Sequence, residues 1–373
     1  MSALDKSTAL AYNIESGFYH TVSIARWSMA RTTLRTIAEA VGVTTSTVSR
    51  VLSQDATCYV CQEKKDAILA CARRLDYSPN PSAKNLALGK TFNVAFALDN
   101  YFRLERTGPF LFQSIKGLQA ELEGAGYALS LITLDTQDWR AMEALCASSH
   151  KYDGVVFGCG YITEGNMDLV TGSGMPVALL EDDASFLGDI PRTVVNKAGG
   201  IAKLLAHLAD LGHRRIALYG CGSQVELFKQ VFQAEGWKDA GVVFEFVMDD
   251  IYNLSLLAYL SADSLLSQLE RFTALCCTND LIALGLCKRL EKEGVVIGRH
   301  VSVTGFDDLS MILNVSSDDD FLTTVRNPRF EMGRETAKLL LERIDSGGNR
   351  ISRKVLPCEI VVRRSTGPAC QGQ

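Results

Sequence analysis

The sequence lacks the catalytic motifs of several large enzyme classes. It contains no Walker phosphate-binding loop, no complete G-x-G-x-x-G, no G-x-S-x-G and no H-E-x-x-H. Each of these motifs supplies a phosphate cradle, a nucleophile or a pair of zinc ligands that its chemistry requires. The five histidines do not cluster in the sequence, and His213, in a turn before a strand, is expected to form structural hydrogen bonds. We therefore expect no catalytic residues.

The chain also lacks an apolar run of the roughly 20 residues needed to cross a bilayer. Its N-terminus has no compact apolar stretch of the kind found in a secretory signal. These two absences predict a soluble, cytoplasmic protein that has no membrane partner.

The eleven cysteines are not expected to form a disulfide framework. Their number is odd, the chain is long, and Cys146, Cys276, Cys277 and Cys287 lie in apolar runs, where a free thiol packs like a small apolar side chain. The single C-x-x-C at positions 58–61 has no second pair at zinc-site spacing. No metal and no other cofactor is expected.

Positive charge is concentrated near the N-terminus. Residues 31–90 hold nine Lys and Arg against five Asp and Glu, although the whole chain has a net charge of −5. A small basic region joined to an acidic remainder suits a protein that presents one end to phosphates. The bias favours a nucleic-acid partner without identifying one.

Three helices are predicted in this basic region. Residues 1–28 show no periodicity and are expected to be a disordered extension before an initiator at Met29, with a functional N-terminal arm as the alternative. Thr33 and Thr44 are placed to cap helices over 34–40 and 45–52, and Gly42 supplies the turn between them. A third amphipathic helix is expected at 62–75, before a proline-containing stop.

From residue 91 onward, short apolar runs alternate with amphipathic segments, a pattern typical of a parallel α/β sheet that is buried on both faces. Two strand-to-glycine junctions, at 152–160 and 214–222, suggest two similarly built subdomains. The strands are expected at 93–98, 128–133, 154–157, 177–180, 215–219, 242–247, 274–277 and 302–305. Helices are expected between these strands, notably at 112–125, 196–211, 264–272, 281–293 and 330–344.

The helix at 45–52 has the polar outer face that a DNA-reading helix needs. Its outward positions are Thr45, Ser46, Thr47, Ser49 and Arg50. An arginine can form a bidentate hydrogen bond to guanine, worth roughly 1–3 kcal/mol of discrimination, while hydroxyls and backbone N–H groups bond phosphates. Any small helical bundle would share the apolar pattern, so that alternative stays open at this point.

Residues 34–52 (LRTIAEAVGVTTSTVSRVL) resemble the DNA-binding head of the lac-repressor (LacI/GalR) family, whose pattern is approximately L-x-D-V-A-x-x-A-G-V-S-x-x-T-V-S-R-V-L-N. Segments 75–80 and 83–86 continue the match. Thr36 stands where the family often has an acid. The loop at 55–60 most resembles the subgroup that includes the repressor of the evolved β-galactosidase.

The resemblance extends over roughly residues 33–368. Its further motifs are 211–217 (LGHRRIA), 278–285 (TNDLIALG), 303–308 (VTGFDD) and 322–326 (LTTVR). It implies an all-α helix-turn-helix head plus an α/β periplasmic-binding-protein-like body of two doubly wound subdomains, with a ligand cleft between them.

The resemblance also implies which residues bind DNA and which bind the effector. The implied DNA-binding residues are Thr36, Thr44, Thr45, Ser46, Thr47, Ser49 and Arg50 in the head and Asn80, Ala83, Lys84 and Leu86 in the linker. The implied effector-binding residues are Asp99, Phe110, Glu181, Phe228, Asn279, Asp307 and Asn327. Considered without the family, Asn279 and Asp307 are more often helix caps or turn residues. An arginine that many members direct at the effector is missing, because Phe228 or Gln233 stands there.

The expected function is that of a homodimeric transcriptional repressor, released from double-stranded operator DNA by a small sugar or sugar derivative. The linker would become helical on DNA, with Leu86 wedged into the minor groove. A corepressor effect of the ligand is the opposite possibility. The alternative functions are a soluble carbohydrate-binding protein and a sugar-processing enzyme, neither of which would bind an operator.

These expectations divide the chain into a head, a linker and a body. The helix-turn-helix domain occupies 29–78 and the hinge helix 79–90. The body occupies 91–368, with an N-subdomain at about 91–194 and 326–348 and a C-subdomain at about 195–325 and 349–368.

Overall fold

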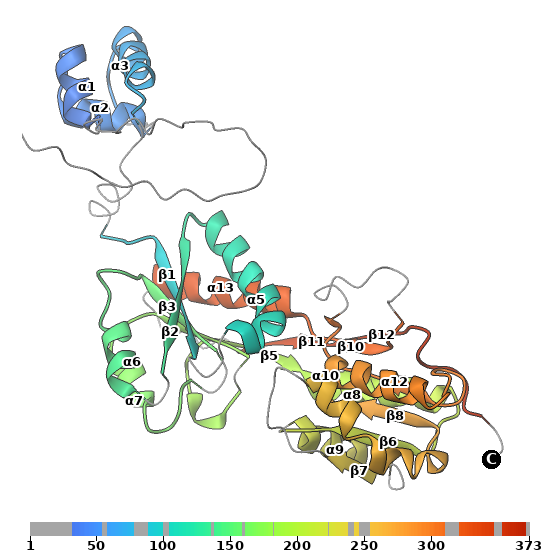
Figure 1. Ribbon diagram of the computed structural model, residues 1–373. Coiled ribbons are helices and arrows are strands. Elements are labelled where there is room, and N and C mark those ends of the chain that lie inside the picture. Colours follow the sequence, from blue (N-terminus) through green and yellow to red (C-terminus); the bar gives the residue numbers. More distant parts are fainter. Residues whose placement is uncertain are drawn as a thin grey trace, which may run out of the picture. The chain divides into compact units, whose positions relative to one another are not determined.

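The computed structural model describes residues 32–53, 58–77, 89–99, 104–135, 138–158, 161–181, 183–222, 224–237, 242–245, 254–309, 321–346 and 353–370. The side chains at 99, 104–110 and 242–245 are outside this description. The chain divides into two compact units, a head within residues 1–84 and a body within 85–373 (Figure 1). The expected extension at 1–28 and residues 79–88 of the expected hinge helix lie outside the described residues.

Three helices form the head: α1 (Leu34–Val41), α2 (Thr45–Leu52) and α3 (Gln62–Arg74). The backbone N–H of Thr36 donates to the Thr33 hydroxyl at 3.3 Å, and that of Thr47 donates to the Thr44 hydroxyl at 3.2 Å. Gly42 ends α1 in the left-handed region at φ 69°, which glycine adopts without steric cost. Both predicted caps and the predicted turn are confirmed.

The head has its own apolar core. Ile37, Val48 and Ile68, one from each helix, are fully buried in a single cluster. Cys58 and Cys71 are buried in the same core, whereas Cys61 is exposed at the start of α3. Burial of three apolar side chains of this size stabilises the head by roughly 1.5–3 kcal/mol each.

The body contains two parallel sheets. The first has the strand order β11-β5-β4-β3-β1-β2 and the second has the order β7-β6-β8-β9. The strands of the first are β1 (Asn93–Asp99), β2 (Ala128–Leu134), β3 (Gly154–Phe157), β4 (Val177–Leu180), β5 (Arg192–Asn196) and β11 (Arg353–Pro357). Those of the second are β6 (Ile216–Gly220), β7 (Val242–Glu245), β8 (Ala274–Cys277) and β9 (Ser302–Thr304). An antiparallel pair, β10 (Thr324–Arg326) and β12 (Glu359–Val361), joins the second sheet through parallel bridges from Thr304 to Thr323 and from Asp307 to Arg326.

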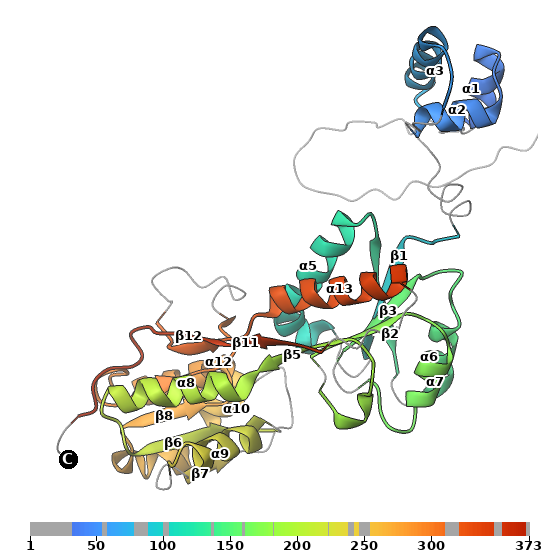
Figure 2. The same cartoon turned by 180° about the vertical axis from the view of Figure 1, so that it is seen from behind.

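Helices cover both faces of each sheet (Figures 1 and 2). On the first sheet, α5 (Leu104–Gly124) and α13 (Arg329–Ser346) lie side by side on one face, with α6 (Trp139–Cys146) and α7 (Met167–Gly172) on the other. On the second sheet, α8 (Lys197–Asp210) and α9 (Gln224–Ala234) cover one face, and α10 (Leu254–Leu260) and α12 (Asp280–Lys292) cover the other. The short elements are α11 (Asp263–Leu266), η1 (Ser185–Leu187) and η3 (Leu269–Arg271).

The period of two along each strand produces these layers. In β6, Ala217 and Tyr219 pack with α10 and α12, whereas Ile216 and Leu218 pack with α8 and α9. Successive side chains of a strand point to opposite faces of the sheet, so a continuous apolar strand fills two cores. This is why the apolar runs of the sequence show no alternation.

The C-terminal crossing between subdomains differs from our expectation. We expected the C-subdomain to begin again at about residue 349. Strand β11 instead pairs in parallel with β5, from Arg353 opposite Arg192 to Pro357 opposite Asn196. Five residues of backbone pairing hold this segment in the first sheet, so the chain crosses after Pro357.

Other differences concern short elements. The helix expected at 264–272 is broken into α11 and η3. Strands β5 and β10 to β12 were not predicted, and helices α6, α7, α9 and α10 lie between predicted strands where helices were expected without stated bounds. The missed strands contain charged or polar residues, such as Arg192 in β5 and Arg353 and Lys354 in β11, so they lack the continuous apolar runs that identify the other strands. Among the helices in the described part of the chain, none is long and apolar enough to span a membrane.

Candidate DNA-binding and effector-binding sites

Helix α2 presents most of the expected DNA-binding side chains to solvent. Thr45, Ser46, Ser49 and Arg50 are exposed, and Thr47 is half-buried. The fully buried Val48 anchors the helix to the head core, so its outer face is held in one orientation. Such a helix can place polar side chains against base edges while its core-facing side stays packed.

The two remaining head residues lie at helix starts. Thr36 is exposed, and its hydroxyl lies 3.1 Å from that of Thr33. Thr44 is exposed and caps α2, so its hydroxyl already accepts the Thr47 N–H. The expected linker residues, namely Asn80, Ala83, Lys84 and Leu86, lie outside the described residues.

A chain of four alternating charges lies where the two subdomains of the body meet. The Lys197 ammonium Nζ is 2.7 Å from Oε1 of Glu181, whose Oε2 is 3.6 Å from Nη1 of Arg329. Nη2 of Arg329 donates to Oδ1 of Asp307 at 2.7 Å. We call Lys197, Glu181, Arg329 and Asp307 the charged cluster. It brings together two predicted effector residues and two cations that were not predicted.

All four residues of the charged cluster follow the carboxyl ends of strands. Glu181 follows β4, Lys197 follows β5, Asp307 follows β9, and Arg329 follows β10 and begins α13. In open α/β sheets, ligands bind outside the carboxyl ends of the strands. The cluster therefore occupies the edge at which a ligand site is expected.

Each member of the charged cluster has a position or a backbone conformation that costs free energy. Lys197 and Arg329 are the first residues of α8 and α13, where the helix dipole disfavours a cation by about 0.3–1 kcal/mol. Glu181 and Asp307 have φ angles of 60° and 110°, which cost a residue with a side chain about 1–3 kcal/mol. The surrounding fold must offset these costs, and such residues concentrate at functional sites.

Electrostatic coupling within the cluster is reflected in its pKa shifts. Burial raises the pKa of the Glu181 carboxyl, but Arg329 and then Lys197 lower it by more, so the net shift is downward. Burial lowers the pKa of Lys197, and Glu181 more than reverses this. For Asp307, burial raises the pKa more than Arg329 lowers it. Glu181 and Lys197 therefore hold their charges near neutral pH.

Two amide side chains accompany the charged cluster. Asn327 is 5% exposed and its Oδ1 has no hydrogen-bond partner. Asn279 is half-buried and caps α12 by accepting the Ile282 N–H at 2.9 Å. The cap agrees with the local interpretation of Asn279, and it occupies only part of the acceptor capacity of the oxygen.

Three expected effector residues are not placed at the cluster by the structure. Phe228 is 1% exposed and packs edge-to-face against Phe232 and Phe306, at ring-centroid distances of 6.3 and 5.9 Å. The assignment of Phe228 to the ligand is therefore corrected, because its ring is enclosed in the core between α9 and the second sheet. The side chains of Asp99 and Phe110 lie outside the described residues.

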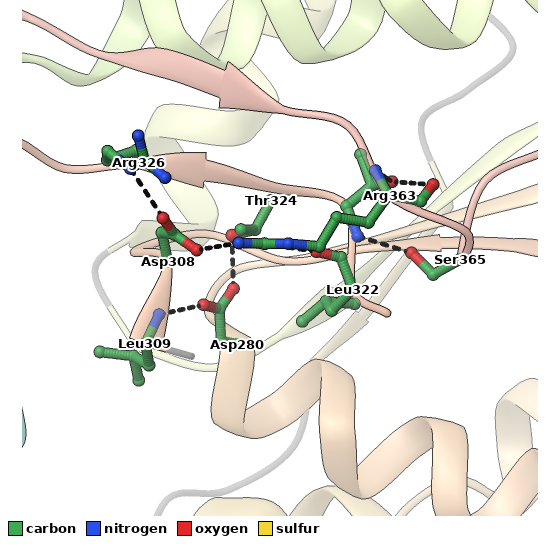
Figure 3. Close-up of polar contacts among 9 residues, drawn as sticks. Asp280, Asp308, Leu309, Leu322, Thr324, Arg326, Arg363 and Ser365 are labelled. Carbon is green, nitrogen blue, oxygen red and sulfur yellow. Dashed lines mark hydrogen bonds and ion pairs between the residues drawn. The ribbon is translucent and has the colours of Figure 1, made fainter. Parts of the chain in front are cut away.

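A second polar network ties the loop after β9 to the crossing strands (Figure 3). Asp308 accepts from Nε of Arg326 at 2.7 Å and from Nη2 of Arg363 at 2.8 Å. Arg363 also donates through Nη1 to the carbonyl of Leu322 at 2.8 Å. Asp308 therefore fixes the position of its neighbour Asp307, which belongs to the charged cluster.

Asp280 holds the same loop from below the strands (Figure 3). Its Oδ2 accepts the Leu309 N–H at 2.7 Å, and its Oδ1 is 2.5 Å from the Thr324 hydroxyl. A Cβ at Gly305 would lie 2.2 Å from Oδ1 of Asp280, so only glycine fits there. Burial raises the pKa of Asp280 to about 8, against the lowering effect of these two hydrogen bonds.

Other features of the body are structural. His213 bonds through Nδ1 to the Thr273 hydroxyl at 2.9 Å and through Nε2 to the Gly367 carbonyl at 3.0 Å, which confirms its predicted role. Cys146, Cys276, Cys277 and Cys287 are buried free thiols, as predicted. Burial raises the pKa of Cys146 to about 11 and that of Cys276 to about 12.

Over the residues that the structure describes, no group of three or more His, Cys, Asp or Glu is arranged to hold a metal ion. A pocket of about 230 Å³ lies at the amino end of β4, lined by residues that include Val170, Met175, Pro176 and Arg343. That edge of the sheet is opposite to Glu181.

Lys197 and Arg329 were missed by sequence reasoning although the sequence carried a signal. Each is a cation directly after a short β-branched or polar segment and at the start of an amphipathic helix. A lysine or arginine at that position conflicts with the helix dipole, and the conflict marks a specific partner.

Two segments of the chain match known protein families. Residues 33–80 match the family described as bacterial regulatory proteins, lacI family. Residues 205–366 match the family described as periplasmic binding protein-like domain. The first segment contains α1 to α3, and the second contains most of the second sheet and Asp307, Asn327 and Arg329.

Whole-chain comparisons give the same assignment. The chain is 26% identical over 345 residues to the HTH-type transcriptional repressor PurR of Haemophilus influenzae (strain PittEE), covering 89% of this chain and 98% of that protein. The corresponding repressor of Photobacterium profundum is 25% identical over 341 residues, with the same coverage.

Solved structures establish the fold. The lac repressor dimer bound to operator and the anti-inducer ONPF is similar with a TM-score of 0.71 and 20% identity, covering 90% of this chain and 99% of that one. The transcriptional regulator CelR in complex with cellobiose is similar with a TM-score of 0.60 and 23% identity, covering 90% and 100%. The expected fold, a helix-turn-helix head on a periplasmic-binding-protein-like body, is confirmed.

Proposed function

The chain belongs to the lacI family of bacterial regulatory proteins, and we propose from this premise that it represses transcription until a small sugar-like effector releases it from its operator. The observation that carries the proposal is the exposed polar face of α2 on an independently packed head. Relatives that span nearly the whole chain are named transcriptional repressors. The protein is a DNA-binding regulator, and we assign it no enzymatic activity and a cytoplasmic location.

DNA recognition is assigned to α2 and the linker. Ser46, Ser49 and Arg50 would face base edges in the major groove, while Thr36 and Thr44 at helix starts would contact phosphates. The segment 79–90 would form the hinge that reaches the minor groove. A similar protein, the lac repressor, binds its operator as a dimer, and we propose that this chain acts as a homodimer on a pseudo-palindromic site.

Effector control is assigned to the edge where the charged cluster lies. Asp307 follows β9 of the second sheet, whereas Glu181 follows β4 of the first sheet and Arg329 begins α13, which covers the first sheet. A ligand bound there would contact both subdomains. Structures in this fold contain cellobiose or ribose, which supports a sugar-like effector here. Effector and operator would bind with reciprocal coupling, so DNA weakens effector binding by the factor by which the effector weakens DNA binding.

Binding to the region upstream of its own gene tests the function. Full-length protein is titrated into the labelled fragment at several salt concentrations. A repressor binds it more tightly than a shuffled fragment, and its log affinity falls linearly with log salt. Arg50→Ala is expected to weaken specific binding by roughly 5- to 150-fold.

Arg35→Ala is the matched control, since it removes one exposed cation from α1 of the same head. This variant is expected to retain most of the specific affinity. Equal binding of wild type and Arg50→Ala to the upstream fragment would contradict the proposal, as would equal affinity for the shuffled fragment.

A further inference from the structure

We propose that Lys197 and Arg329 determine the charge class of the effector: the site selects an uncharged ligand that presents two adjacent hydroxyls to Lys197 and Glu181, and it rejects acid and phosphate derivatives of the same sugar. This inference rests on the proposed effector-binding function and adds the specificity of that site.

Charge balance is the first argument. Each carboxylate of the charged cluster has a cation within 2.7 Å, at Lys197 for Glu181 and at Arg329 for Asp307. Two positive and two negative groups leave no net charge in the cluster. An anionic ligand would bring a further negative charge beside two carboxylates, and a desolvated charge without a counter-ion is strongly unfavourable.

Three cations packed around the cluster are each held by an acceptor of the protein. Arg326 and Arg363 both pair with Asp308, which compensates one of their two positive charges. Lys203 donates to the Cys358 carbonyl at 2.8 Å. A phosphate or carboxylate would therefore have to compete with these acceptors, or break an ion pair of the charged cluster and leave a buried carboxylate unpaired.

Exposure of the cluster is graded along its length. The side chains of Asp307 and Arg329 are 2% and 9% exposed, whereas those of Glu181 and Lys197 are 21% and 28% exposed. The open end therefore consists of one ammonium donor and one carboxylate acceptor in contact with each other. Two adjacent hydroxyls match this pair, because one can donate to Glu181 while the other accepts from Lys197.

Asn327 supplies a third contact point. Its Oδ1 is buried without a hydrogen-bond partner, and its side chain lies against Glu181. A lone buried acceptor requires a donor. A hydroxyl placed at this contact provides one, whereas a carboxylate or a fully ionised phosphate in the same place offers only acceptors.

A purely structural role does not explain these residues. A buried ion pair is often no more stabilising than well-packed apolar side chains. Here both cations additionally stand at helix starts and both carboxylate residues have positive φ angles. Four unfavourable local features at the carboxyl edge of the strands, where ligands bind in this fold, point to a role in recognising the ligand.

Matched sugar derivatives test the proposal on the full-length protein without DNA. A panel of hexoses, pentoses and disaccharides is titrated by calorimetry beside the uronic acid, 6-phosphate (5-phosphate for pentoses) and amino derivatives of each. The expected result is that at least one neutral sugar binds, at least about tenfold more tightly than its acid or phosphate form. Equal or tighter binding of an anionic form would overturn the proposal, and so would binding by no neutral member.

Asp307→Asn is the diagnostic variant. It leaves Arg329 without its close carboxylate, so affinity for anionic derivatives relative to the neutral sugar is expected to rise by about tenfold. Asp183→Asn is the matched control. Asp183 lies only two residues after Glu181, and its carboxylate forms an exposed ion pair with Arg353. The control is expected to keep wild-type selectivity, and equal selectivity in both variants would contradict the role of the cluster.

If Asp307→Asn does not fold, the double variant Asp307→Asn/Arg329→Gln removes a matched pair and keeps the cluster neutral. It is expected to retain the preference for neutral sugars, and a switch to anionic ligands would contradict the charge argument. Operator binding is measured separately. Loss of operator recognition with intact sugar selectivity would refute the repressor function alone, and the reverse outcome would refute only this inference.

Discussion

Helix α2 of the head and the charged cluster of the body hold polar side chains in opposite ways. Ser46, Ser49 and Arg50 are exposed on a helix whose other face is packed, so their chemistry is separate from folding. Arg329 and Asp307 are almost fully buried and depend on each other for charge compensation. The difference indicates that the proposed DNA-reading surface can change without loss of fold, whereas the proposed effector site contributes to the stability of the body.

Substitution by methionine at Arg329 and at Arg50 is expected to give the largest difference in stability. Arg329→Met would leave the buried Asp307 without its cation, which is expected to lower the free energy of unfolding of the body by about 3–5 kcal/mol. Arg50→Met should change the stability of the head by less than about 0.5 kcal/mol. Urea unfolding of the full-length variants, followed by circular dichroism, measures both effects.

The double variant Asp307→Leu/Arg329→Met is the control for this contrast. It removes both charges and is expected to recover most of the lost stability, because no unpaired ion remains. A small effect of Arg329→Met, comparable with that of Arg50→Met, would show that the two regions do not differ in this way.

Weaker DNA binding is the next expected effect, and it should be confined to the head. Ser49→Ala is expected to weaken operator affinity by roughly 1 kcal/mol, because one hydroxyl contact is lost. Sugar affinity without DNA should be unchanged. Fluorescence anisotropy with labelled operator and calorimetry with the sugar measure the two properties, and a change in both would contradict the separation between the regions.

The pH dependence of the free energy of unfolding of the body tests the raised pKa of the buried Asp280 carboxyl. Burial raises the pKa of Asp280 to about 8, whereas an unfolded aspartate titrates near about 3.9. Over the window between these values the folded state holds a proton that the unfolded state has lost. This contribution to stability is fully present below pH about 4 and is lost as the pH rises through about 8.

Asp280→Asn should remove this dependence. An asparagine reproduces the neutral acid, since its oxygen can accept the Leu309 N–H and its nitrogen can donate to the Thr324 hydroxyl. At pH 8 the variant is expected to be more stable than wild type by at least about 1 kcal/mol, with little difference at the acidic end of the window. Asp189→Asn, at an exposed position, is the control, and equal pH profiles for all three proteins would contradict the prediction.

Loss of a helix cap is expected to have a modest effect that is confined to the head. Thr44→Ala removes the acceptor of the Thr47 N–H and is expected to destabilise the head by about 1 kcal/mol. Thr45→Ala, at the next position, should have less than half of that effect. Hydrogen exchange of α2 amides in the full-length protein measures both, and equal protection in the two variants would rule out the cap.

Sequence reasoning was accurate where structure depends on neighbouring residues. The caps at Thr33 and Thr44 and the turn at Gly42 act within four residues of their partners, so the sequence alone contains their geometry. Most strands of the body were found because they are continuous apolar runs. The short strands β5 and β10 to β12 were missed because their pairing is determined by distant strands.

The candidate effector site shows the same limit. Glu181 and Asp307 were identified, but their partners Lys197 and Arg329 lie 16 and 22 positions away, respectively. Which cation meets which carboxylate depends on strand order, which no local pattern contains. The local sequence already predicted that Phe228 is buried. The spacing of a buried helix face is shared by Val225, Phe228, Val231 and Phe232.

The late position of β11 in the chain has a consequence for synthesis. The first sheet is closed at one edge by residues 353–357, whereas the head is complete once residue 77 has been made. A ribosome adding about 5–20 residues per second needs roughly 15 to 55 seconds for the intervening chain. The DNA reader of each new molecule can therefore fold well before the domain that regulates it.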